Sequence, residues 1–136
     1  MIDYELRIEA PIGVVYEMLT DPRLLSEWMA DEAESDSRPG GSFRWAYENG
    51  DVVRGRFVEL DPPRRLVLAY GWEQPVTRGI PPGSTVVEIT LDEEDGATTL
   101  RLVHRGLPPG QLDAHGRGWG YFLGRLATRL AAGSTT

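Results

Sequence analysis

Hydrophobic and polar residues alternate strictly over residues 2–9, at the start of the chain. The apolar positions are Ile2, Tyr4, Leu6 and Ile8, with charged residues between them. Because successive side chains of a strand point to opposite faces, this pattern predicts a half-buried β-strand. Similar patterns predict five more strands, over residues 42–47, 52–60, 65–72, 85–91 and 98–105. The pair Asn49-Gly50 between the second and third strands is a strong hairpin signal.

Two short helices are predicted between the first and second strands. Pro11 suits the first turn of a helix, because its fixed φ and missing N–H cost little there. The apolar face of this helix carries Val15, Met18 and Leu19. The second helix runs from about Pro22 to Trp28. Residues 30–42 are acidic and then contain Pro-Gly-Gly, so we expect a loop there.

The last predicted helix is long, from about residue 111 to residue 132. Its apolar residues fall within one arc about 100° wide at the helical repeat. They are Leu112, His115, Trp119, Phe122, Leu123, Leu126 and Leu130. Gly116, Gly120 and Gly124 follow at every fourth position along the edge of that arc. Since each helical glycine costs roughly 0.5–1 kcal/mol, we interpret the row as a place where another backbone approaches closely. The sheet is the favoured partner, and a helix of a second subunit is the alternative.

These elements predict one α+β domain over residues 1–132 and a flexible tail over residues 133–136. A six-stranded antiparallel sheet would twist and curl around the long helix, and the two short helices would close one end. Many inward residues are large aromatics, whose stiff rings interlock less completely than leucine and valine. We therefore expect an apolar cavity between the sheet and the C-terminal helix. The segment 73–84, with three prolines and two glycines, is long enough to act as its lid.

The candidate binding residues are inward aromatic, histidine and leucine side chains. They are Trp28, Trp45, Tyr70, Trp72, His104, His115, Trp119, Phe122 and Leu123. We expect Trp45, Trp72 and Trp119 to line the cavity, where a ligand or a water could accept a buried indole N–H. For His104 two interpretations stay open: a structural histidine with satisfied nitrogens, or a polar anchor for a ligand. For His115 we expect a hydrogen bond to the preceding loop.

Composition narrows the classes of function. Cysteine is absent, which excludes disulfides, thiolate metal sites and cysteine nucleophiles. The two histidines have no third ligand at metal spacing, and HExxH is absent, so we expect no metal and no other cofactor. No catalytic residue stands out, and noncatalytic binding is favoured over an enzyme. The net charge is −7 and carboxylates are interleaved with the densest arginines, so nucleic acid is not an expected partner.

The chain shows no signal for export or for membrane insertion. It opens without a basic and then apolar leader, so no secretory signal is expected. No apolar run approaches the ~18–20 residues that span a bilayer. We therefore expect a cytoplasmic protein, either a monomer or a weak homodimer.

Several motifs resemble one known family over about residues 3–130. They are Ala10-Pro11, the segment from Leu19 to Trp28, Pro39-Gly40-Gly41-Ser42-Phe43, the segment from Gly55 to Leu66, Thr98–Arg105 with Gly106, and Gly118-Trp119. Together they are similar to the START-like (Bet v 1-like, SRPBCC) superfamily, in the branch of the C-terminal domain of the activator of heat-shock protein 90 ATPase. The resemblance implies a helix-grip fold around a hydrophobic cavity. The superfamily includes lipid carriers, plant hormone binders, polyketide cyclases and antibiotic-sequestering proteins, so the fold alone does not give the function.

The favoured hypothesis is binding of a hydrophobic, aromatic or polycyclic small molecule in that cavity, without catalysis. A first alternative is an enzyme similar to polyketide cyclases and aromatases, with His104 or Tyr70 as general acid or base. A second alternative is a protein-interaction module that regulates a chaperone ATPase.

Overall fold

The computed structural model describes residues 1–73 and 79–134, and for residues 132–134 only the backbone. These residues form an antiparallel seven-stranded sheet in the order β1-β7-β6-β5-β4-β3-β2. The strands are β1 (Ile2–Ile8), β2 (Glu32–Ser35), β3 (Ser42–Ala46), β4 (Val52–Asp61), β5 (Arg65–Trp72), β6 (Thr85–Glu94) and β7 (Ala97–Arg105). The α+β helix-grip prediction is confirmed, with one more strand than expected.

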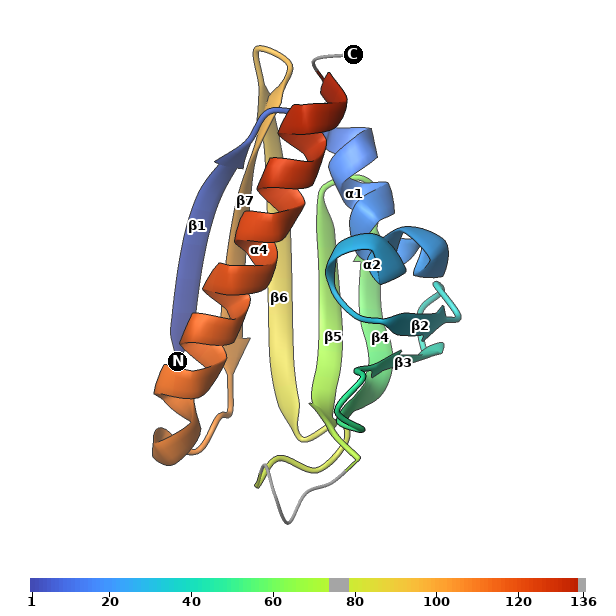
Figure 1. Cartoon of the computed structure of the whole chain (residues 1–136), viewed down its shortest axis with the longest axis vertical. Helices are drawn as coiled ribbons and strands as arrows, with labels where there is room; N and C mark the ends of the chain where they lie inside the picture. The colour runs from blue at the N-terminus through green and yellow to red at the C-terminus, as the bar shows by residue number, and fades with distance from the viewer. Residues whose placement is uncertain (74–78, 135–136) are drawn as a thin grey trace.

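The helices all lie on one face of the curved sheet (Figure 1). They are α1 (Ile12–Thr20), α2 (Pro22–Trp28) and α4 (Leu112–Ser134), and the 3₁₀ turn η1 (Pro109–Gln111) precedes α4. The long α4 crosses the sheet obliquely and packs beside β1, while α1 and α2 cover one end of the face that α4 leaves open. Helix α4 reaches Ser134, inside the segment expected to be a flexible tail, and residues 135–136 lie outside the described part of the chain.

The seventh strand, β2, corrects the prediction of a loop over residues 30–42. Glu32 to Ser35 pair with β3 in antiparallel register, and Ala33 faces Trp45 across the two strands. The strand is short and lies at the edge of the sheet. Edge strands often carry charge, which discourages pairing with other chains. Because Glu32 and Glu34 are charged, this strand shows no clear alternation of apolar residues and was not predicted.

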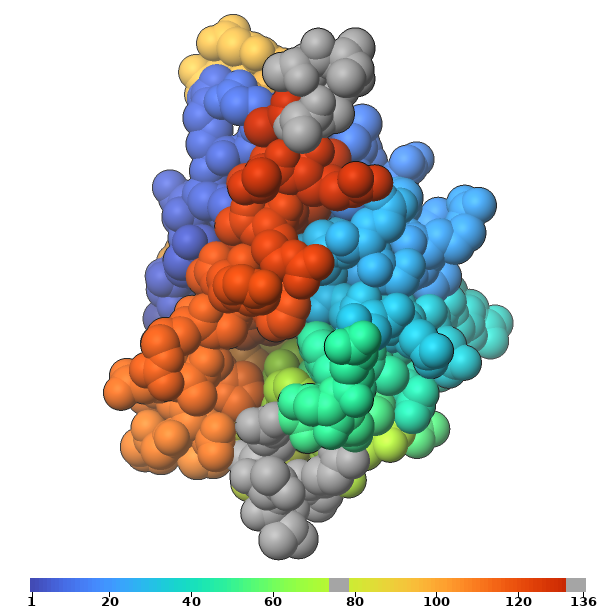
Figure 2. Space-filling model, in the orientation of Figure 1, coloured from blue at the N-terminus to red at the C-terminus, as the bar shows by residue number. Residues whose placement is uncertain are grey.

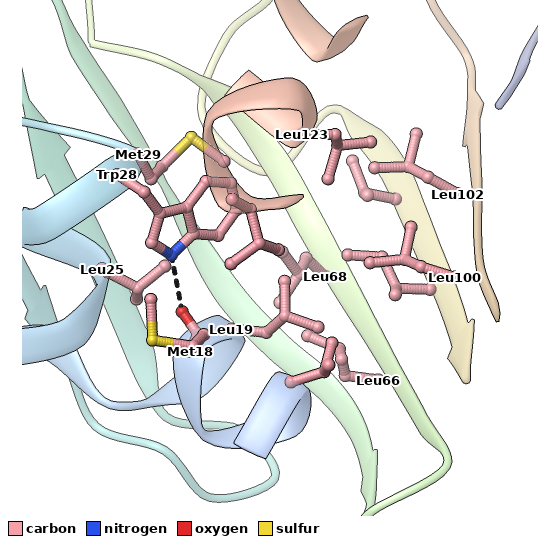
Figure 3. Close-up of a cluster of buried hydrophobic side chains, with 14 of the residues drawn as sticks. Met18, Leu19, Leu25, Trp28, Met29, Leu66, Leu68, Leu100, Leu102 and Leu123 are labelled. Carbon is pink, nitrogen blue, oxygen red and sulfur yellow. Dashed lines mark hydrogen bonds between the residues drawn. The ribbon is translucent and has the colours of Figure 1, made fainter. Parts of the chain in front are cut away.

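The hydrophobic core lies between α1, α2 and α4 on one side and the sheet on the other. Its side chains include Met18, Leu19, Leu25, Trp28, Met29, Leu66, Leu68, Leu100, Leu102 and Leu123 (Figure 3). The Trp28 side chain is only 1% exposed, and its indole N–H donates to the Met18 carbonyl oxygen at 2.9 Å. This buried hydrogen bond ties α2 to α1 and satisfies the one polar atom of that ring.

The glycine row of α4 does not have the close packing that was expected. A Cβ added at Gly120 would lie 3.6 Å from the Tyr4 ring, which is ordinary contact. At Gly116 and Gly124 no atom lies within 4 Å of an added Cβ. The interpretation that the sheet approaches the helix closely at all three positions is therefore wrong. At Gly120 the helix meets β1 through the Tyr4 ring.

Helix α1 is capped by a residue that is distant in sequence. Glu93, in β6, accepts a hydrogen bond from the backbone N–H of Ile12 at 2.8 Å through its Oε2. The first N–H groups of a helix have no partner inside the helix, and Pro11 makes no side-chain cap. A carboxylate also interacts favourably with the positive end of the helix dipole. This contact joins α1 to the far end of the sheet.

Candidate functional site

The structure has a cavity of about 200 Å³ between the first turns of α4 and the ends of β3 and β5. It opens to solvent, and the surface is hollowed between the orange start of α4 and the green β3–β4 region in Figure 2. The lining residues are Met29, Trp45, Tyr47, Tyr70, Trp72, Gln111, Ala114, His115, Gly118, Trp119 and Phe122. Six of these are Trp, Tyr or Phe, so aromatic rings dominate the wall.

Strand β5 and the end of β3 supply the sheet side of this wall. Tyr70 and Trp72 point to the same face of β5 because they are two residues apart. The Tyr70 ring centroid lies 6.3 Å from those of Trp72 and Trp45 and 5.8 Å from that of Trp119. Tyr47, just after β3, lies 6.1 Å from Trp72 and 5.9 Å from Phe122. These spacings are typical of interacting ring pairs.

The helix side of the wall leaves room because two of its residues are small. Ala114 and Gly118 are four residues apart on α4, so they lie one above the other on one face. No atom lies within 4 Å of a Cβ added at Gly118. Phe122, four residues after Gly118, ends this row of small residues, and Trp119 lies beside it. A large side chain at position 118 would enter this space.

His115 is held in one tautomer by two hydrogen bonds. The Trp72 indole N–H donates to His115 Nε2 at 3.1 Å, so this nitrogen carries no proton. The proton therefore lies on Nδ1, which donates to the Gln111 carbonyl oxygen at 3.0 Å. Gln111 ends the 3₁₀ turn that leads into α4, so the bond goes to the segment just before the helix, as expected. The neutral ring links β5 to α4 at the cavity wall.

His104 is completely enclosed, with 0% exposure, and does not line the cavity. Its Nδ1 accepts the Trp119 indole N–H at 3.0 Å. Its Nε2 must then carry the proton and donates to Thr85 Oγ1 at 2.8 Å. The Thr85 hydroxyl donates onward to the Tyr70 carbonyl oxygen at 2.9 Å. Burial, and then the neighbouring His115, lower the pKa of His104 to about 3. These contacts support the first of the two interpretations of His104, a structural histidine whose two ring nitrogens are satisfied.

A smaller, deeper void lies behind the cavity. Its volume is about 10 Å³, and its walls are Leu19, Leu25, Trp28, Met29, Trp45, Leu66, Leu68, Ile89, Trp119 and Leu123. Trp28 and Leu123, both expected at the binding site, line this inner void and not the open cavity. Met29, Trp45 and Trp119 belong to both walls. They form the partition between the two spaces.

The cavity therefore brings together six of the nine candidate residues: Trp45, Tyr70, Trp72, His115, Trp119 and Phe122. Sequence reasoning missed Met29, Tyr47, Gln111, Ala114 and Gly118 as lining residues. Tyr47 continues the alternation of Trp45 and could have been found from that signal. The small residues Ala114 and Gly118 gave no comparable signal, because a pattern of apolar side chains does not identify open space.

The expected lid over residues 73–84 lies partly outside the described residues, which omit 74–78. The described end of this connection packs on β5. The Trp72 backbone N–H donates to the Ile80 carbonyl oxygen at 2.8 Å, and Ile80 is only 1% exposed. A Cβ on Gly71 would lie 1.8 Å from the Pro81 carbonyl oxygen. Only glycine at position 71 allows this approach.

The polar groups of the wall are neutral. Among residues 1–73 and 79–134, none of those that line the cavity is an aspartate, a glutamate or an arginine. Burial raises the pKa of Tyr70 well above its ordinary value, and it also raises the pKa of Tyr47, so both phenols keep their protons at neutral pH. The Arg125 guanidinium lies outside the lining, 6.0 Å from the centroid of the Phe122 ring. The wall thus offers uncharged donors and aromatic faces.

Two other features of the described residues bear on function. Residues 1–73 and 79–134 contain no group of three or more His, Asp or Glu side chains placed to hold a metal ion. No helix in the same ranges is long and apolar enough to cross a bilayer.

A family model of known proteins matches residues 9–131, nearly the whole chain. That model describes activator of Hsp90 ATPase homolog 1-like proteins. This chain belongs to that family. The resemblance to the heat-shock protein 90 ATPase activators within the START-like superfamily is confirmed.

Three individual relatives are 28–30% identical to this chain. An uncharacterized protein of Schizosaccharomyces pombe is 29% identical over 107 residues, which are 76% of this chain and 29% of that protein. The crystal structure of DynU16, a protein of the dynemicin biosynthetic locus, matches 97% of this chain and 47% of DynU16, with a TM-score of 0.82 and 28% identity. CalU16 from Micromonospora echinospora matches 92% of this chain and 70% of CalU16, with a TM-score of 0.73 and 30% identity. This family member therefore spans less than half of the first two relatives.

Proposed function

We propose that this family member binds a hydrophobic aromatic small molecule in the cavity between β3, β5 and α4, without catalysing a reaction on it. The observation that carries the proposal is a cavity open to solvent whose wall is mainly aromatic rings. Ligand sites are commonly concave and apolar, with a few polar groups that fix orientation. Here Trp72 and Trp119 supply flat faces for stacking, and Tyr47, Tyr70 and Gln111 supply the polar groups.

The size of the cavity favours a small ligand over a large polycycle. Pockets for drug-sized ligands have volumes of roughly 300–1,000 Å³, whereas the volume of this cavity is about 200 Å³. An apolar cavity of about 150 Å³ is enough for benzene. One or two fused rings therefore fit inside, and a longer molecule would extend through the opening.

The alternative of a cyclase-like enzyme has less support from the described contacts. General acid–base catalysis needs a group that reaches the substrate and titrates near the working pH. Both nitrogens of His104 are engaged and its ring is enclosed. Tyr70 is the remaining candidate, and burial raises its pKa well above the ordinary value, so at neutral pH its hydroxyl stays protonated and can donate a hydrogen bond but cannot act as a base. The location of DynU16 in a biosynthetic locus is in keeping with a biosynthetic product or intermediate as the bound molecule.

Two matched glycine variants of α4 test the proposal. Gly118→Leu adds a side chain into the open cavity, and Gly116→Leu adds the same side chain outside its lining, where no atom lies within 4 Å of the new Cβ. Both changes replace a helical glycine and favour the helix by roughly 1 kcal/mol. Quenching of tryptophan fluorescence by bicyclic aromatic compounds measures binding. We expect Gly118→Leu to weaken binding at least about tenfold and Gly116→Leu to leave it unchanged.

Equal affinities in the two variants would show that the cavity is not the binding site. Failure of bicyclic aromatic compounds to bind the wild-type protein would remove the proposal altogether. Thermal unfolding of both variants controls for changes in the fold.

A further inference from the structure

The four tryptophan N–H groups differ in how they are satisfied. Trp28 donates to the Met18 carbonyl oxygen, Trp72 to His115 and Trp119 to His104. The Trp45 indole nitrogen is buried and has no hydrogen-bond partner among residues 1–73 and 79–134. Its side chain is only 4% exposed. A buried donor without a partner destabilises the folded state, so this one needs an explanation.

The position of Trp45 connects that free donor to the cavity. Trp45 lines both the open cavity and the smaller void behind it, and its ring packs 4.7 Å from Phe43 and 6.3 Å from Tyr70. The Trp45 ring lies at the inner end of the cavity, but its nitrogen is buried, so an acceptor on a ligand reaches the N–H only where the wall shifts to admit it. Met29 shares this partition, and methionine side chains adapt readily to new shapes.

Water is a poor partner for this donor on the inner side. The void there holds about 10 Å³, at the lower limit for one water molecule. A buried water also needs two to four polar partners, and the void is walled by leucine, isoleucine, methionine and tryptophan side chains. An acceptor brought in by a ligand would satisfy Trp45 without these requirements.

We propose that Trp45 is the specificity-determining hydrogen-bond donor of this cavity, and that its ligands are neutral one- or two-ring aromatic compounds with a carbonyl oxygen at the end that enters first. This inference rests on the proposed binding function. A site discriminates strongly between ligands when the wrong ligand leaves one of the site's buried polar groups without a hydrogen-bond partner. The part of the lining that the structure describes carries no charged side chain, which disfavours carboxylates such as fatty acids, because a buried charge without a partner is costly.

The indole N–H signals of tryptophan provide a direct test in the wild-type protein. Protein labelled with ¹⁵N at tryptophan gives one indole signal for each ring, and the Trp→Phe variants assign them. The protein is titrated with α-tetralone, a two-ring ketone, and with tetralin, the hydrocarbon of the same skeleton. We expect α-tetralone to move the Trp45 N–H proton downfield, while tetralin does not. The Trp28 signal serves as the internal control, since its N–H is bonded inside the core.

The variant Trp45→Phe adds an affinity measurement. It keeps an aromatic ring and removes the N–H, so the affinity for α-tetralone should fall roughly three- to tenfold, while that for tetralin changes little. Equal losses for both compounds would mean that Trp45 only packs against the ligand, which overturns the inference. A Trp45 signal in the wild-type protein that moves alike with both compounds would also overturn the inference. This measurement does not depend on the folding of the variant. If tetralin binds as tightly as α-tetralone, binding in the cavity is supported, but the proposed selectivity for a carbonyl oxygen is wrong. If neither binds, the proposed function fails as well.

Discussion

His104 illustrates at the scale of a single residue how a buried polar group is fixed by its neighbours. Trp119 donates to one nitrogen. Thr85 Oγ1 accepts from the other, and its hydroxyl donates a hydrogen bond to the Tyr70 carbonyl oxygen. Each donor in this series meets one acceptor. The neutral ring therefore holds the first turns of α4 against β5, β6 and β7, directly behind the cavity wall.

The first prediction concerns the charge of His104. Burial lowers its pKa to about 3, whereas an unfolded histidine titrates near 6.5. The unfolded chain therefore binds the proton first, and the stabilising contribution of His104 is complete above about pH 6.5 and is lost as the pH falls toward about 3. At pH 5 this loss is about 2 kcal/mol. An NMR titration should show no change in the His104 ring signals between pH 8 and pH 5, and a midpoint near 6.5 would contradict the hydrogen-bond assignment.

Residue patterns in the sequence predicted which side chains point inward, but not how deep they lie. Trp28, Trp45 and Trp119 all face the interior, as their spacing indicated. Trp28 is closed into the core by its bond to Met18, whereas Trp45 reaches the open cavity. The difference depends on contacts between elements far apart in sequence. Periodicity within one element carries no information about them.

At the scale of elements, the two short helices and the long helix were predicted closely, because each has strong start or stop signals. Pro22 begins α2, and Trp28 ends it, as expected from the sequence. Strand β2 was missed because its polar residues and short length gave no alternation of apolar positions. The capping of α1 by Glu93 was also missed, because Glu93 lies far from Ile12 in the sequence and no pattern within one element links them.

The second prediction tests this cap. Glu93→Ala removes the acceptor of the Ile12 N–H, and we expect the free energy of unfolding to fall by roughly 0.5–2 kcal/mol, as for other helix caps. Glu94→Ala is the matched control, since it removes the same charge next to the cap and should change stability by less than about 0.5 kcal/mol. Urea unfolding at neutral pH compares them. Equal effects of the two variants would mean that charge alone, and not the hydrogen bond, is responsible.

At the scale of the whole molecule, the cavity follows from an incomplete match between the helices and the sheet. The sheet has seven strands, while α4 packs beside β1 and the short helices cover the other end. The first turns of α4 therefore stand away from β3 and β5, and Gly118 keeps the gap open. The helix-grip arrangement could be predicted from the order of elements, but the size of the gap could not, because it depends on individual side chains.

The most direct test of the binding function is native mass spectrometry of the protein purified under gentle conditions from its own cells. We predict a retained small molecule with a mass in the range of a one- or two-ring aromatic compound. The same mass should be present in Gly116→Leu and absent from Gly118→Leu. A wild-type protein that carries no small molecule, or a molecule retained equally by both variants, would contradict the account.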